Sequence, residues 1–206
     1  KPEEKFVLLP QDSAGDPDVF QQLLKQETVP VPDYLAPCNP GFSDDNLSVD
    51  RYISRDFHRQ EAEKMWPKVW QFVGREEQIP KAGDHLVYDI VDDSIIVMRG
   101  DDGVIRGFHN SCLHRGRALR TSGGTVGQLK CPYHGFTWDL KGKLESIPCA
   151  WDFKYLKKEE QNLPEVRVES WKGFVFINMD PDAKPLLEHL DVLPDHFRDY
   201  AFERSV

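Results

Sequence analysis

The pattern of hydrophobic and polar residues changes at about Val69, from helical spacing to the alternation that is typical of β-strands. Before this point, residues 54–66 are predicted to form a helix with Ser54 as its N-cap, and Pro67 limits its extent. Beyond Val69, short runs rich in β-forming residues follow one another; they cover residues 70–73, 85–90, 94–99 and 104–109. The pattern therefore predicts a helix followed by a mainly β structure.

Turn signals between these runs predict an antiparallel meander. Asp102-Gly103 is a strong hairpin signal between the last two runs, and Asp92-Asp93 is a weaker one before them. Gly123-Gly124 and Lys141-Gly142 mark two further turns. Short connections of this kind join neighbouring strands, so we expect the three runs from residue 85 to 109 to lie side by side in one sheet.

The C-terminal half adds further elements. We expect short strands at residues 128–130 and 136–140, a polar helix or loop at 151–162, one buried strand at 166–178, and a helix at 186–200 that contains Pro194. The chain as a whole is predicted to be mostly β with flanking helices, an α+β fold.

Residues 1–50 are predicted to form an irregular arm, because seven prolines interrupt any regular element there. One short helix is expected from Pro17 to about Glu27, with Asp16 as its N-cap. The arm has two interpretations: a contact with another subunit, or a tail that covers its own domain.

Two loops each combine a cysteine with a histidine: Cys112 with His114, and Cys131 with His134. Thiolates and imidazoles in this combination predict a metal site, either zinc or an iron–sulfur cluster. Zinc sites usually open with two cysteines two to four residues apart. One cysteine and one histidine in each loop instead suit a cluster of two irons, in which each loop gives its thiolate to one iron and its imidazole to the other. A Cys2His2 zinc site remains the alternative.

The sequence C-x-H-R-G followed by C-P-Y-H-G resembles the Rieske iron–sulfur domain of the large (alpha) subunits of ring-hydroxylating oxygenases. Asn110 and Trp138 fit the flanking pattern of that family, and the resemblance covers roughly residues 45–200. It implies an antiparallel β domain with a two-loop cluster-binding subdomain. It also implies a 2Fe–2S cluster, with Cys112 and Cys131 on the inner iron and His114 and His134 on the outer one.

The resemblance also implies a division of the chain: an N-terminal arm at 1–50, the Rieske domain at 51–155, and the incomplete start of a catalytic domain at 156–206. In the family, electrons pass from a ferredoxin or reductase to a mononuclear non-haem Fe(II) that activates O2 to hydroxylate an aromatic substrate. That iron, held by two histidines and a carboxylate, belongs to the adjacent alpha subunit of a trimer. A beta subunit is a further possible partner.

His189 and His196 are the candidates for a second iron site, and their spacing does not fit one. Seven residues apart on a helix, they would stand about 10 Å apart along its axis. We therefore expect this chain to lack the catalytic iron and to be inactive in hydroxylation by itself. The alternative function is a self-contained Rieske ferredoxin, an electron carrier without catalysis. The long arm and the residues beyond 150 favour the oxygenase.

Other residues near the motif have simpler interpretations. His58 is predicted to be a surface residue, and His85 and His109 are predicted to be structural. Arg115, Arg117 and Arg120 make the first loop basic. They form either a docking rim for an acidic electron donor or salt bridges within their own domain.

The high-potential Rieske proteins of respiratory complexes resemble the chain at the four ligands but place a serine at Phe136 and a tyrosine at Trp138. Their hydroxyls donate to cluster sulfurs and raise the reduction potential. We expect a low potential here.

Composition limits the kinds of partner and the cellular location that we expect for the protein. The net charge of −9 over 206 residues argues against a nucleic-acid partner, and no apolar run is long enough to span a membrane. Cys38 and Cys149 lie outside the motif and could pair, but no small disulfide scaffold is visible. We expect a cytoplasmic protein; because the chain begins at Lys1, a processed leader stays an open alternative.

Overall fold

The computed structural model describes residues 17–28, 30 and 48–204. The chain divides into two compact units, Lys1–Tyr52 and Ile53–Val206. In the first unit, helix α1 (Pro17–Leu24) confirms the helix expected in the arm, although it ends earlier than Glu27. The rest of the predicted arm, including Asp16 and Cys38, lies largely outside the described residues. A single helical turn, α2 (Asp50–Ile53), spans the boundary between the units.

The second unit opens with helix α3 (Arg55–Lys64), which confirms the helix predicted before the sheet. The Ser54 hydroxyl accepts a hydrogen bond from the Phe57 N–H at 3.2 Å, so Ser54 is the predicted N-cap. Pro67 then lies in a 3-10 turn, η2 (Trp66–Lys68), because its ring cannot continue the α-helix.

The predicted meander forms the centre of a seven-stranded sheet. Strands β2 (Asp84–Ile90), β3 (Asp93–Arg99) and β4 (Ile105–His109) pair antiparallel in sequence order. The turn at Asp102-Gly103 has Gly103 at φ 79°, a left-handed conformation that favours glycine. A short strand β5 (Gly124–Thr125) pairs with the other edge of β2.

The prediction of one buried strand over residues 166–178 was wrong. The segment is a hairpin of β9 (Glu165–Trp171) and β10 (Phe174–Asn178). Lys172 and Gly173 connect them with φ of 47° and 83°, and two successive left-handed residues suit a tight hairpin turn. The hairpin joins β4 to β1 (Gln71–Arg75), which gives the sheet order β1-β10-β9-β4-β3-β2-β5. The division of the chain at residue 155 stays a prediction, and β9 and β10 share a sheet with the strands before it.

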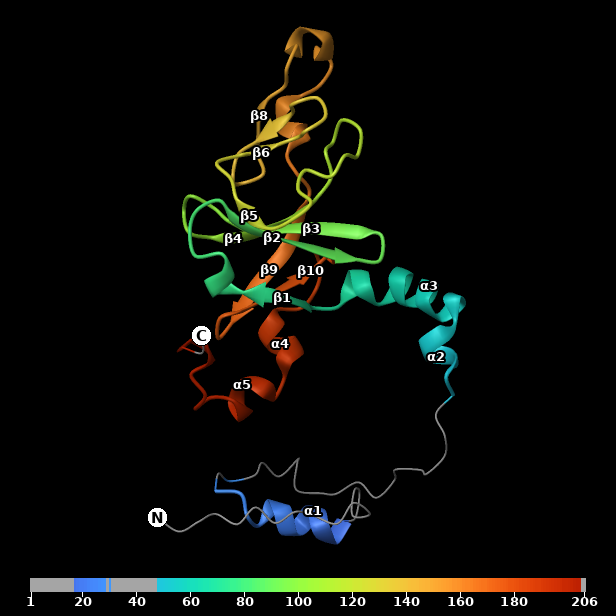
Figure 1. Cartoon of the computed structure of the whole chain (residues 1–206), viewed down its shortest axis with the longest axis vertical. Helices are drawn as coiled ribbons and strands as arrows, with labels where there is room; N and C mark the ends of the chain where they lie inside the picture. Colours follow the sequence, from blue (N-terminus) through green and yellow to red (C-terminus); the bar gives the residue numbers. More distant parts are fainter. Residues whose placement is uncertain (1–16, 29, 31–47, 205–206) are drawn as a thin grey trace. The chain divides into compact units, whose positions relative to one another are not determined.

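A second, three-stranded sheet carries the other half of the motif. It consists of β6 (Leu129–Lys130), β7 (Thr137–Trp138) and β8 (Leu144–Ser146). Figure 1 shows β6 and β8 at one end of the second unit, beyond β2 to β5 of the large sheet, with α4 and α5 at its other end. Side chains from both sheets form one core cluster, which includes Phe108, Phe136 and Trp138 together with both cysteines of the motif.

The predicted helix at 186–200 is broken in two. Helix α4 (Leu186–Leu190) ends at Asp191, whose φ of 49° leaves the helical region, and α5 (Leu193–His196) begins after it with Pro194 in its first turn. Leu186 and Leu190 pack against Trp70 beside the large sheet.

The remaining short elements are 3-10 turns. They are η3 (Glu76–Gln78), η4 (Ala150–Phe153), η5 (Lys158–Gln161) and η6 (Phe202–Arg204). Within the described ranges, no helix has the length and apolar character required to cross a membrane.

Candidate metal centre

The two loops of the motif have the same backbone geometry. In the first, the Cys112 N–H donates to the Arg117 carbonyl at 2.9 Å and the Gly116 N–H donates to the Cys112 carbonyl at 2.8 Å. In the second, the Cys131 N–H donates to the Phe136 carbonyl at 2.8 Å and the Gly135 N–H donates to the Cys131 carbonyl at 3.1 Å. The two glycines have φ of 67° and 74°, left-handed conformations that favour glycine, so each loop turns sharply at this residue.

These loops bring the four predicted side chains together as two like pairs. Cys112 and Cys131 are each only 2% exposed, and their thiols lie within hydrogen-bonding contact. The ring centroids of His114 and His134 are 4.6 Å apart; His114 is half-buried and His134 is exposed. In the part of the chain that the structure describes, no three His, Cys, Asp or Glu side chains are placed around one point to hold a single ion. The arrangement is a thiol pair inside and an imidazole pair outside.

The two thiols differ in their electrostatic surroundings. Burial raises the pKa of Cys112, and the neighbouring Cys131 adds to this effect. Burial also opposes the thiolate of Cys131, but the backbone N–H groups of Tyr133 and His134 and the charge of Arg117 outweigh it, so the Cys131 pKa is lowered. Backbone N–H groups of His114 and Arg115 face the Cys112 sulfur in the same way. Each loop thus directs two N–H groups at its own sulfur, a favourable setting for a bound thiolate.

The Nδ1 atom of His114 is the observation that most favours a metal-binding role for these side chains. It is buried and has no hydrogen-bond partner among the described residues. Buried polar atoms are nearly always paired, so an unpaired ring nitrogen beside a thiol pair fits a metal ligand. Burial, with smaller contributions from His134 and Arg115, lowers the His114 pKa. A lowered pKa favours the neutral imidazole, which is the form that binds a metal.

Aromatic rings surround the imidazole pair. The Phe136 ring stacks on His114 with centroids 5.0 Å apart and an interplanar angle of 6°. The Phe153 ring meets His114 edge-on at 5.6 Å and 88°. The Tyr133 ring lies against the His134 ring, with their centroids 3.7 Å apart. Sequence reasoning missed Phe153, because the segment at 151–162 was predicted only as a polar helix or loop.

Asn110 braces the first loop at its base. Its side-chain oxygen accepts from the backbone N–H groups of Leu119 and Arg120 at 2.9 and 3.0 Å. Its amide nitrogen donates to the Arg120 carbonyl at 2.6 Å and to the Ser94 hydroxyl at 2.9 Å. Asn110 is 5% exposed, so these contacts are shielded from water. The side chain joins both ends of the loop to β3.

A second contact ties the end of the first loop to β2. The Arg120 Nε donates to His85 Nε2 at 3.1 Å, and His85 Nδ1 lies 3.2 Å from the Gly83 carbonyl. His85 is 1% exposed, which confirms its predicted structural role. Arg120 is therefore engaged in a contact within its own domain rather than held free for a docking partner. Arg115 and Arg117 are exposed, and no ion pair to either is found among the described residues.

Two side chains beside the second loop donate to backbone carbonyls rather than to the thiol pair. The Trp138 indole N–H donates to the Gln161 carbonyl at 2.7 Å. The Thr137 hydroxyl donates to the Gly135 carbonyl at 2.9 Å.

The remaining histidines and the third described cysteine lie elsewhere. The His58 side chain is 63% exposed, as predicted for a surface residue. His109 is half-buried at the end of β4. His189 and His196 are exposed on separate short helices, α4 and α5. Cys149 is an exposed free thiol, and its possible partner Cys38 is outside the described residues.

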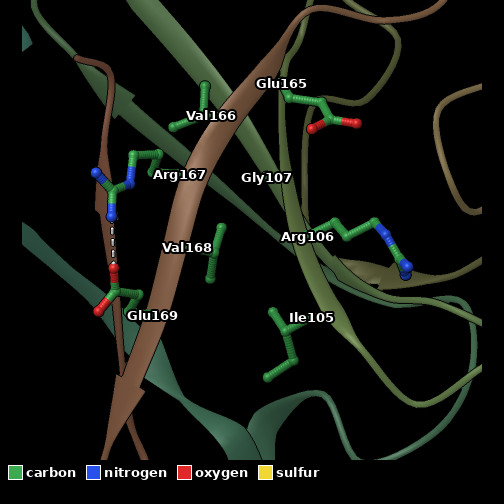
Figure 2. Close-up of a pocket in the computed structure, with 8 residues that line it drawn as sticks. All are labelled: Ile105, Arg106, Gly107, Glu165, Val166, Arg167, Val168 and Glu169. Carbon is green, nitrogen blue, oxygen red and sulfur yellow. Dashed lines mark hydrogen bonds and ion pairs between the residues drawn. The ribbon is translucent and has the colours of Figure 1, made fainter. Parts of the chain in front are cut away.

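A shallow groove of about 340 Å³ lies between β4 and β9 (Figure 2). The two strands pair only at Gly107–Val166 and Phe108–Glu165 and then diverge. Arg167, at its rim, pairs with Glu169 at 2.8 Å, and Arg106 pairs with Asp102 at 2.8 Å. Because both cations are already neutralised, we interpret the groove as a gap between diverging strands.

Comparison with known proteins identifies the class. Residues 69–163, which include both loops, match the family described as Rieske [2Fe-2S] domain. The chain therefore contains a Rieske domain, and proteins of similar sequence include alpha and oxygenase subunits of Rieske oxygenases.

The relatives span more than one kind of substrate. Over 141 residues the chain is 39% identical to biphenyl 2,3-dioxygenase subunit alpha of Rhodococcus jostii (strain RHA1), covering 68% of this chain and 31% of the relative. It is 33% identical over 140 residues to the carnitine monooxygenase oxygenase subunit of Escherichia coli (strain K12), covering 68% of this chain and 37% of the relative. A solved quaternary ammonium Rieske monooxygenase superposes with a TM-score of 0.69 at 29% identity, covering 73% of this chain and 41% of that one. The chain thus spans about a third of the length of these curated relatives.

Proposed function

We propose that this chain is the electron-transfer portion of a Rieske oxygenase large subunit, with a 2Fe–2S cluster held by Cys112, His114, Cys131 and His134. The observation that carries the proposal is the pairing of like ligands: two buried thiols in contact, with two imidazoles outside them, one of which has an unpaired buried nitrogen. The cysteines would hold the inner iron and the histidines the outer one. When bound, the cluster would supply reversible one-electron oxidation and reduction.

The residues around the cluster have separate tasks in this proposal. The loop N–H groups stabilise the thiolates, and the core cluster keeps water from the inner pair. Exposed Arg115 and Arg117 offer positive charge to an acidic ferredoxin or reductase. A mononuclear iron, whose ligands would lie outside these 206 residues, would receive the electron, and neighbouring alpha subunits in a trimer would bring it near. A beta subunit and a cytoplasmic location belong to the same proposal.

The substrate stays open, since the relatives include a biphenyl dioxygenase and a carnitine monooxygenase. An aromatic substrate was the expectation from the motif, and the second relative supports a quaternary ammonium compound equally. The alternative of a self-contained Rieske ferredoxin is less favoured, because the structural likeness to an oxygenase covers 73% of the chain. We expect the 206-residue chain to accept electrons and to form no hydroxylated product by itself.

The test of the proposal is metal analysis of the purified protein. We expect two irons and two acid-labile sulfides per chain and an EPR signal after reduction. The variant His134→Ala should lose or destabilise the cluster, because it removes an iron ligand. The matched control His189→Ala changes an exposed histidine on α4 and should retain it. Stoichiometric zinc without sulfide in freshly prepared protein would refute the cluster and favour the Cys2His2 zinc site.

A further inference from the structure

The His114 ring lies between two phenylalanine rings that come from different parts of the chain. Phe136 belongs to the second ligand loop and covers one face of the imidazole. Phe153 is the last residue of η4 and meets the imidazole edge-on. The two phenylalanines also contact each other, with centroids 5.5 Å apart at 88°. The three rings therefore form a closed set, in which each ring touches the other two.

The two imidazoles of the site differ in this respect. The ring contacts of His134 found among the described residues are with His114 and with Tyr133, its neighbour in the same loop. Tyr133 is 60% exposed, so it shields His134 little. Phe136, by contrast, is 1% exposed, and Phe153 packs against the core cluster that lies under both loops. Only the His114 ring is thus held by aromatic groups that are themselves anchored.

The segment that carries Phe153 is fixed next to the ligand loops. Pro148 packs closely over Gly135, where an added Cβ would lie 3.1 Å from the proline ring. The η4 turn is closed by a hydrogen bond from the Asp152 N–H to the Cys149 carbonyl at 2.9 Å. After it, Leu156 donates to the Phe153 carbonyl at 3.0 Å and packs into the same core cluster. Contacts on both sides of Phe153 therefore hold its ring against His114.

We infer that Phe153 is a positioning residue, which with Phe136 fixes the orientation of the His114 imidazole and keeps water from its buried Nδ1. The inference rests on the proposed cluster, in which this nitrogen would bind the outer iron. A metal-bound histidine is usually oriented by a hydrogen bond to its second nitrogen. Here ring contacts on one face and one edge restrict its rotation. Removing Phe153 frees that edge and opens a path for water.

The experiment compares Phe153→Ala and Phe153→Leu with Trp151→Ala in the cluster-containing protein. Trp151 lies in the same η4 turn but is 68% exposed, so its removal controls for a general change in the segment. For Phe153→Ala we expect chelator-driven loss of the visible absorption to be about tenfold faster. This factor is equivalent to about 1.4 kcal/mol, the order of two edge-to-face ring contacts. The EPR signal of its reduced form should broaden, because His114 would sample several orientations. Phe153→Leu still excludes water, so its rate of cluster loss and its EPR line width should lie between those of Phe153→Ala and the unaltered protein. Trp151→Ala should match the unaltered protein in both measurements.

Two results would overturn the inference while leaving the cluster assignment intact. One is an EPR line shape and a rate of cluster loss that are unchanged in both Phe153 variants. The other is an equal effect of Trp151→Ala, which would mean that the segment acts as a whole rather than through Phe153. If Phe153→Ala does not fold, Phe153→Leu decides with the same two measurements. Absence of the EPR signal from the unaltered protein would instead refute the proposed function.

Discussion

Replacing Asn110 by alanine should destabilise both the fold and the proposed cluster, because one side chain braces the whole first loop. The substitution removes the acceptor of the Leu119 and Arg120 N–H groups and the donor to the Arg120 carbonyl. Leu119 is 3% exposed, so water cannot replace its lost partner. A buried backbone group without a partner costs about 1–3 kcal/mol. With a smaller cost at the half-buried Arg120, Asn110→Ala should lower the free energy of unfolding by about 2–4 kcal/mol.

The matched control is Asn178→Ala, which removes another buried asparagine, at the end of β10 in the large sheet. Asn178 is 1% exposed and contacts Lys68 and Asp180, neither of which belongs to a ligand loop. Guanidinium unfolding measures stability, and decay of the visible absorption under a chelator measures cluster retention. Both variants should be less stable, but only Asn110→Ala should release iron faster. An unfolding free energy within about 0.5 kcal/mol of the unaltered protein, or equal iron release in the two variants, would refute the reasoning.

Two further predictions concern the electrochemistry and the pH dependence. The midpoint potential should lie near the low end of the Rieske range, on the order of −150 mV rather than +300 mV. The reason is that the Trp138 indole and the Thr137 hydroxyl donate to backbone carbonyls rather than to the cluster. A redox titration with a midpoint well above zero would contradict this expectation. Burial lowers the pKa of His85 in the folded protein below its value in the unfolded chain, which is about 6.5. As the pH falls below about 6.5, the unfolded chain takes up a proton at His85 more readily than the folded protein does, so the free energy of unfolding decreases. Urea unfolding at about pH 7.5 and pH 5 should show a larger loss for the unaltered protein than for His85→Gln, which cannot take up the proton; equal losses would rule out His85 as a contributor.

The sequence was most informative where chemistry and spacing coincide. The ligand residues are close in the chain, and the Asp102-Gly103 turn fixes the meander that leads into the first loop. Both could be predicted because local signals determine them. The β9–β10 hairpin was missed although Lys172-Gly173 is a turn signal, because the hydrophobic residues around it continue on both sides.

Contacts between residues far apart in the chain could not be predicted from these local signals. Phe153 meets His114 across 39 positions, and because Trp151 and Tyr155 are also aromatic, the sequence does not indicate which ring turns inward. The Trp138 indole was known to be a donor, but the choice of the Gln161 carbonyl as its acceptor depends on how η5 packs. The helix likewise ends at Asp191, three residues before the Pro194 that the sequence singles out, and Leu186 and Leu190 on the near side of this break pack against Trp70.

The matching backbones of the two ligand loops separate the shape of the site from the surface around it. Main-chain hydrogen bonds close each loop, and the exposed side chains at its tip, such as Leu113 and Tyr133, take no part in the closure. Such positions can change without disturbing the cradle beneath them. In the function proposed above, substitutions at these tips would change the surface that an electron donor meets while the main-chain hydrogen bonds that shape the two loops are kept.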